Sequence, residues 1–135
     1  MTQEDKQLLL KDLCARLPYG PFVKLMEKFD DEDSEHFREI HNLSTYDIEL
    51  LNSDEISNIK PYLRPMSSMT EEEMIEFNNI PSTKNYTIIE NDLPWDVAHY
   101  KQIDWLNKNM FDYRGLIPKG LALSIDELTH IGIKI

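Results

Sequence analysis

Apolar residues never run for more than three or four positions in this chain of 135 residues, and this spacing limits what the chain can fold into. A membrane-spanning helix needs about 20 consecutive apolar residues, so the sequence predicts no membrane span. The hydrophobic fraction of 41% and the charged fraction of 29% are typical of a soluble globular protein rather than a disordered or fibrous one. The length suits one domain, and we expect a single domain over residues 1–135.

The charge balance limits the partners of the chain. It carries 25 acidic and 14 basic residues, which gives a formal net charge of -11. Such a charge opposes direct binding to a nucleic-acid backbone, because each phosphate contact works against the field of the protein itself. One cysteine excludes a disulfide framework and a Cys-rich zinc module. The charged N-terminal segment MTQEDKQ lacks the apolar core of a signal peptide, so we expect a cytoplasmic protein.

Residues 2–17 have the clearest helical pattern. Thr2 can cap the helix, and the acidic residues at 4 and 5 suit the helix dipole in the first turn. Pro18 ends the helix. A reactive thiol needs partial exposure and an electropositive setting, so we interpret Cys14, on the apolar stripe, as a core residue. The stripe at helical spacing comprises Leu9, Leu10, Leu13, Cys14 and Leu17.

The following segment mixes strand and turn patterns. Residues 22–29 fit either a helix or a short strand, whereas residues 37–41 and 46–50 alternate as strands do. The acidic run at 30–35 lacks the glycine and the glutamate that a calcium-binding loop needs, which favours a solvated loop. Two prolines make residues 56–65 an edge strand or a short 3₁₀ turn.

Two capping boxes mark helix starts in the second half of the chain. Thr70 with Glu73 opens one short helix, and Ser124 with Glu127 opens another of little more than one turn. The other elements that we expect here are a strand at 86–90, a helix at 99–110 and a short terminal strand at 133–135.

These patterns predict an α+β fold. We expect an N-terminal helix, then a small antiparallel β meander or barrel-like sheet, then short helices. A composition shift at Ser67 and Ser68 indicates a possible minor joint near residues 66–70.

The histidines lack the spacing of metal ligands. His36 and His41 flank Glu39, but their separation places them on opposite faces of a strand and off a single face of a helix. His99 and His130 are isolated in the sequence. We therefore expect no metal site.

The sequence contains no recognisable catalytic motif. It has no Gly-x-Ser-x-Gly elbow, no phosphate-binding loop and no dinucleotide fingerprint, and it has four glycines in all. Carboxylates are plentiful, but their positions do not single out a general acid/base pair. We therefore expect a protein without catalytic residues or a cofactor, with an uncharacterised hydrolase as an alternative.

Two Arg/Tyr segments are the candidate ligand-binding residues. Tyr62 and Arg64 form the first segment, and Tyr113 and Arg114 form the second. An arginine beside an aromatic ring can stack on a base or hold a phosphate, so the two segments could line a nucleotide pocket. In the structural alternative both arginines pair with carboxylates while the tyrosines pack. The surplus of carboxylates favours this alternative.

Three blocks of sequence carry a resemblance to a group of proteins. They are residues 8–20 (LLLKDLCARLPYG), residues 59–73 (IKPYLRPMSSMTEEE), and residues 104–107 (DWLN) followed by 111–123 (FDYRGLIPKGLAL). In these blocks the chain resembles small uncharacterised proteins of gut Bacteroidales and their phages or prophages. The blocks cover about a third of the chain.

The resemblance implies a phage or mobile-element context. In that context the chain could inhibit a host defence system, act as a regulatory adaptor on a host protein, or sequester a small signalling nucleotide. The net charge and the missing catalytic motifs favour a non-enzymatic interaction protein that engages a basic face on a partner protein. The alternative is a small-molecule binder, such as a sponge for a nucleotide signal.

Overall fold

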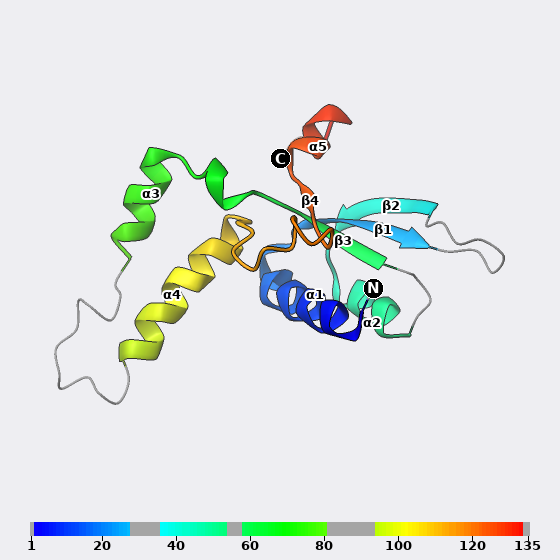
Figure 1. Ribbon diagram of the computed structural model, residues 1–135, viewed down its shortest axis with the longest axis horizontal. Coiled ribbons are helices and arrows are strands. Elements are labelled where there is room, and N and C mark those ends of the chain that lie inside the picture. Colours follow the sequence, from blue (N-terminus) through cyan, green and yellow to red (C-terminus); the bar gives the residue numbers. More distant parts are fainter. Residues whose placement is uncertain (1, 28–35, 54–57, 81–93, 134–135) are drawn as a thin grey trace.

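The computed structural model describes residues 2–27, 36–53, 58–80 and 94–133, which form an α+β fold as predicted (Figure 1). The first half contains α1 (Gln3–Arg16), η1 (Leu17–Tyr19), β1 (Phe22–Glu27), β2 (His36–Asn42), α2 (Thr45–Ser53) and β3 (Asn58–Leu63). The second half contains η2 (Met66–Ser68), α3 (Glu71–Asn78), α4 (Pro94–Lys108), β4 (Leu123–Ser124) and α5 (Asp126–His130). The ambiguous segment that begins at residue 22 is therefore a strand.

The four strands form one open, mixed sheet in the order β2-β1-β3-β4. β1 runs antiparallel to both β2 and β3, whereas β4 pairs with β3 in parallel. A meander would place β2 between β1 and β3. Here α2 instead carries the chain from the outer strand β2 back across the sheet to β3, on the other side of β1.

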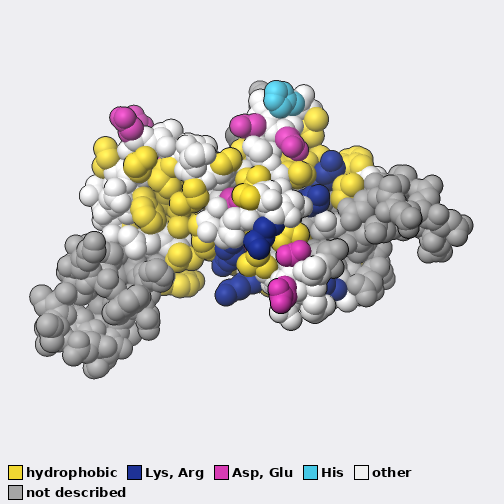
Figure 2. Space-filling model, viewed as in Figure 1, with side chains coloured by type: hydrophobic (Ala, Val, Ile, Leu, Met, Phe, Trp, Pro, Cys, Tyr) yellow, Lys and Arg dark blue, Asp and Glu magenta, His cyan; other side chains and the backbone are white. Residues whose placement is uncertain are grey.

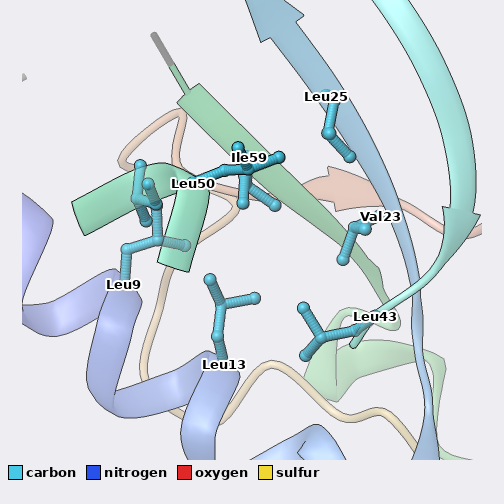
Figure 3. Close-up of a cluster of buried hydrophobic side chains, with 8 residues drawn as sticks. Leu9, Leu13, Val23, Leu25, Leu43, Leu50 and Ile59 are labelled. Carbon is cyan, nitrogen blue, oxygen red and sulfur yellow. The ribbon is translucent and has the colours of Figure 1, made fainter. Parts of the chain in front are cut away.

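The main core lies between the sheet and the helices α1 and α2. Leu9 and Leu13 of α1 are fully buried and lie toward Val23 and Ile59 of the sheet (Figure 3). The predicted cap is confirmed, since the hydroxyl of Thr2 accepts a 3.0 Å hydrogen bond from the backbone N–H of Asp5. The buried members of this core are Leu9, Leu13, Val23, Leu25, Leu43, Leu50, Leu51 and Ile59. Burial of each such side chain stabilises the fold by about 1.5–3 kcal/mol.

The prediction that Cys14 is a core residue is wrong, because its side chain is exposed. The buried residues of α1 are Leu9, Asp12, Leu13 and Arg16, at helical spacings of three and four. Cys14 follows Leu13 by one position and is thus rotated about 100° from the centre of this face. The apolar residues of α1 form a broad stripe, and two charged residues within it are buried in place of the thiol.

The strand predicted at 46–50 is also wrong, because these residues belong to α2. The carboxylate of Asp47 accepts hydrogen bonds from the backbone N–H and the hydroxyl of Ser44, at 2.8 and 3.2 Å, where the helix begins. Leu50 and Leu51 are buried with Asp47 and follow it by three and four positions, which is the spacing of one helix face. The alternation of apolar and polar residues over positions 46–50 was too short to distinguish a strand from one face of a helix.

The segment around Pro61 is a strand but not an edge strand, because β3 lies between β1 and β4. Pro61 is opposite Val23 of β1. On its other side, β4 pairs with Tyr62 and Leu63 and does not reach Pro61. The missing N–H of the proline therefore leaves no gap in the β3–β4 pairing.

The Ser124–Glu127 capping box predicted from the sequence does not form. Ile125 occupies the cap position of α5 and makes no side-chain cap hydrogen bond. Ser124 instead belongs to β4, where it pairs with Leu63, so the helix begins later than predicted. Ile133 is not in a strand. The acidic run at 30–35, the strand predicted at 86–90 and residues 134–135 lie outside the described residues.

Helices α3 and α4 form an arm at the opposite end of the molecule from the β1–β2 hairpin (Figure 1). The Thr70–Glu73 capping box is confirmed, with bonds of 3.1 Å from the Glu73 N–H to the Thr70 hydroxyl and 3.0 Å from the Thr70 N–H to the Glu73 carboxylate. The helix predicted at 99–110 is present as α4, which both begins and ends earlier than predicted, at Pro94 and Lys108. Among the described residues, no helix has both the length and the apolar character to cross a membrane.

Candidate functional site

A buried charge network joins α1 to the loop after α4. Asp12 and Arg16 are both fully buried, and Arg16 Nε donates a 2.9 Å hydrogen bond to Asp12 Oδ2. The other carboxylate oxygen of Asp12 accepts a 2.8 Å hydrogen bond from Arg114 Nη1. One carboxylate therefore faces two guanidinium groups, and the cluster carries one positive charge in excess.

The carbonyl of Phe111 and the ring of Tyr113 complete the surroundings of Arg16. Arg16 Nη2 donates a 2.6 Å hydrogen bond to the Phe111 carbonyl oxygen, while its Nη1 has no partner in the described part of the chain. The centroid of the Tyr113 ring lies 5.5 Å from Cζ of Arg16 and 4.6 Å from Cζ of Arg114. Tyr113 also donates a 2.9 Å hydrogen bond to Asn107 Oδ1 of α4. The ring therefore contacts both cations while its hydroxyl is fixed to α4.

Asp112 fixes the loop that carries Arg114. Its carboxylate oxygens accept hydrogen bonds from the backbone N–H groups of Leu116 and Ile117, at 2.8 and 2.9 Å. Gly115, which lies between Asp112 and Leu116 in the sequence, has a φ of +73°, which a residue with a side chain rarely adopts. These contacts hold Arg114 in place over Asp12.

A pocket of about 360 Å³ lies beside Arg114, between the end of α1 and α4. Its volume falls in the range of small-molecule sites, roughly 300–1,000 Å³. The apolar part of the wall consists of Ala15, Pro18 and Ile103. The polar and aromatic part consists of Tyr19, Tyr100, Asp104, Asn107 and Arg114.

The hydroxyl of Tyr19, from η1, donates a short hydrogen bond to the carboxylate of Asp104, from α4. This hydrogen bond is the main cause that raises the pKa of Tyr19 to about 12, and burial adds to it. The phenol is therefore neutral at physiological pH and serves as a hydrogen-bond donor to Asp104. Among the described side chains, no cation forms an ion pair with Asp104.

A second set of contacts attaches the α3–α4 arm to the sheet. Arg64, which follows β3, donates two hydrogen bonds of 2.7 Å to the two carboxylate oxygens of Glu73. The Arg64 guanidinium also lies 4.2 Å from the centroid of the Phe111 ring. The hydrogen bonds from Arg64, and then that from the Thr70 backbone, lower the pKa of Glu73 to about 2. Glu73 is therefore ionised over the whole physiological range.

Trp105 of α4 links the two helices of the arm. Its Nε1 donates a 3.0 Å hydrogen bond to Glu76 Oε1, and its ring lies 5.6 Å from that of Phe77. On its other side it stacks on Phe111, with ring centroids 5.6 Å apart and an interplanar angle of 14°. The orientation of α3 is therefore fixed at two points along its length. Glu73 is bound to Arg64 and Glu76 to Trp105, and the Phe111 ring contacts both Arg64 and Trp105.

The side of α3 away from these contacts is exposed. No residue of α3 is buried, and the exposed fractions of Met74 and Ile75 are 48% and 62%. Glu71, Glu72 and Glu76 are also exposed. Figure 2 shows hydrophobic side chains gathered over the arm with acidic side chains at one end of it, and basic side chains over the middle of the molecule. We call the exposed residues Glu71, Glu72, Met74 and Ile75 the α3 face.

The structure does not bring the four candidate ligand-binding residues into one pocket. Tyr62 is buried in β3, and Arg64 is engaged by Glu73. Tyr113 is bonded to α4, and Arg114 is paired with Asp12. These contacts match the structural alternative for all four. Arg114 also lines the pocket beside α4, so ligand binding at this residue stays a prediction.

His41 is held by two carboxylates. Its Nε2 lies 2.7 Å from Asp47 Oδ1, and its Nδ1 lies 3.1 Å from Glu39 Oε2. Burial lowers the pKa of His41, but the hydrogen bonds to Asp47 and Glu39 outweigh it, and the net shift is upward from 6.5. In the described ranges, no group of three His, Cys, Asp or Glu side chains is arranged to hold a metal ion. The side chains of His36 and His99 are not among those that the structure describes, so their role stays a prediction.

Sequence reasoning missed the residues that build the pocket and the buried network. Asp12 and Arg16 offered a signal, because they lie four positions apart and in register with Leu9 and Leu13. Asp104 offered none, since its contact with Tyr19 joins positions 85 residues apart. No protein family, curated protein or solved structure matches this chain.

Proposed function

We propose that this chain is a non-enzymatic binding protein that docks through its α3 face on a partner protein. The single observation that carries the proposal is the exposure of Ile75, at 62%, and of Met74 beside it, on a fixed helix whose N-terminal end carries the exposed Glu71 and Glu72. Exposed apolar side chains of this size, surrounded by charge, are typical of protein interaction sites.

The chemistry of α3 defines the partner. Four of its eight residues are glutamate, and the helix contains no basic residue. Glu73 is neutralised by Arg64, whereas Glu71 and Glu72 are exposed at the N-terminal end. We therefore expect a partner surface with an apolar depression for Ile75 and a rim of lysine or arginine. The net charge of -11 would accelerate the encounter with such a surface at low ionic strength.

The rigid attachment of α3 supports this use of the helix. An isolated helix of eight residues is unstable in water. Here the capping box and the Arg64–Glu73 pair fix its first turn, and Trp105 fixes its last turn through Glu76 and Phe77. A helix that is ordered before binding loses less entropy on association, which favours affinity.

For the biological role we propose what the resemblance to proteins of gut Bacteroidales and their phages or prophages implies. In that setting a docking protein without catalytic residues would act as an inhibitor of a host defence system or as a regulatory adaptor on a host protein. The nucleotide-sponge alternative predicts a pocket lined by Arg64, Arg114 or Tyr113. Arg114 lines a pocket beside α4, whereas Arg64 is committed to Glu73 and is not among the lining residues, so we favour docking.

The test is capture of a partner from a Bacteroidales lysate by tagged full-length protein, compared among charge variants. We expect capture by the wild type, weaker capture at high salt, and loss of capture in Glu72→Lys. Glu49→Lys is the matched control, because Glu49 is an exposed helical glutamate of α2 and the change in charge is the same. Failure to capture any protein, or equal capture by Glu72→Lys and the wild type, would contradict the proposal.

A further inference from the structure

We infer that the pocket between α1 and α4 is a binding site for a small zwitterion, an α-amino acid with an apolar side chain. This inference is independent of the α3 face. It rests on the two opposite charges that line the pocket, Asp104 and Arg114, and on the apolar wall between the helices.

The positive charge at the pocket is in excess. Arg114 shares the carboxylate of Asp12 with the fully buried Arg16, so one carboxylate serves two cations. The Arg114 side chain is 15% exposed, and it is the member of this cluster that lines the pocket. An anionic group in the pocket would therefore restore the balance that Asp12 alone does not provide.

The negative charge at the pocket is also uncompensated. The hydrogen-bond partner of Asp104 is the neutral hydroxyl of Tyr19. In the described part of the chain, Asp104 pairs with no cation, and the distance between its carboxylate and the Arg114 guanidinium exceeds the 4.0 Å of an ion pair. The two charges therefore face the same pocket without neutralising each other.

A ligand that satisfies both groups must carry both charges close together. An α-amino acid does so, because its ammonium and its carboxylate are attached to one carbon. The ammonium would meet Asp104, and the carboxylate would meet Arg114. The side chain would then lie against Ala15, Pro18 and Ile103, with the ring of Tyr19 beside it. The volume of about 360 Å³ is sufficient for such a ligand.

Calorimetric titration of the full chain with three matched probes tests the site. L-Phenylalanine carries both charges, phenethylamine keeps only the ammonium, and 3-phenylpropionate keeps only the carboxylate. We expect L-phenylalanine to bind and each single-charge analogue to bind about tenfold or more weakly, because each lacks one charged hydrogen-bonding group. Absence of binding by L-phenylalanine and L-leucine at millimolar concentration, or equal binding of the three probes, would overturn the inference.

Asp104→Asn tests the orientation of the ligand. We expect this variant to bind L-phenylalanine about tenfold or more weakly, while its affinity for 3-phenylpropionate does not fall. Asp126→Asn, at an exposed position in α5, is the control and should bind both probes as the wild type does. An unchanged affinity of Asp104→Asn for L-phenylalanine would overturn the inference. The comparison of the three probes on the wild-type protein tests it even if the variant does not fold.

Discussion

Asp12 accepts a 2.8 Å hydrogen bond from Arg114, a residue 102 positions later in the chain, and this contact ties the first helix to the loop after α4. The other oxygen of the same carboxylate holds Arg16, which is fully buried. The Asp12 carboxylate therefore lies against two arginine cations, one on each oxygen.

Replacement of Asp12 by alanine should be strongly destabilising. It leaves Arg16 buried without a counter-ion, a change that costs about 3–5 kcal/mol in other proteins. We expect the free energy of unfolding, measured by urea titration, to fall by about that amount. Glu4→Ala, at an exposed position in the first turn of the same helix, should cost less than about 1 kcal/mol. A loss of less than about 1 kcal/mol for Asp12→Ala would show that Arg16 finds another partner.

The exposed side chain of Cys14 provides a chemical test of the position of α1. Ellman's reagent should modify Cys14 in the folded protein without denaturant, because the thiol is exposed. Cys14→Ala should change the free energy of unfolding by less than about 0.5 kcal/mol, whereas Leu13→Ala should reduce it by about 2–5 kcal/mol. A thiol that reacts only after unfolding would place Cys14 in the core instead.

The Arg64–Glu73 pair predicts a loss of stability in acid. The pKa of Glu73 lies at about 2 in the folded protein, below its ordinary value of 4.5, so its ionised form is stabilised by folding. This contribution is fully present above pH 4.5 and is lost as the pH falls toward 2. The difference in melting temperature between the wild type and Glu73→Gln should therefore be constant above pH 4.5 and should shrink as the pH falls below 4.5. A difference that stays constant throughout the acid range would contradict the shift.

The ion pairs of His41 should stabilise the fold at low pH and lose this effect as the pH rises. Its pKa is raised above 6.5 in the folded protein, so folding favours the protonated ring between Asp47 and Glu39. The stabilisation is fully present below pH 6.5 and is lost as the pH rises through the folded pKa. Urea titrations of the wild type and His41→Asn should converge as the solution becomes alkaline. His130→Asn, at an exposed position, is the control, and a gap between wild type and His41→Asn that widens with pH would contradict the assignment.

The parts of the fold that could be predicted from the sequence are those with a local cause. The capping of α1 by Thr2 and the capping box of α3 depend on residues three positions apart, and both form as predicted. The segment at 46–50 was predicted wrongly, because the hydrogen bonds of Asp47 to Ser44 and the burial of two adjacent leucines were needed to reveal a helix.

The candidate site could not be predicted to the same extent. Its contacts join distant positions, such as Tyr19 with Asp104 and Arg16 with the carbonyl of Phe111. The sequence did indicate that Arg64 and Arg114 pair with carboxylates, but it could not identify Glu73 and Asp12 as their partners. Tertiary packing decides which carboxylate each arginine meets, and no local pattern records that choice.

The most direct test of the docking account is the affinity of the captured partner for two matched variants. Ile75 on α3 and Tyr46 on α2 have nearly equal exposed fractions, 62% and 61%, so their replacement by aspartate removes similar exposed apolar side chains. We predict that Ile75→Asp weakens the measured Kd at least about tenfold, while Tyr46→Asp leaves it unchanged within about twofold. Equal affinities of Ile75→Asp and the wild type would contradict a function that depends on the α3 face.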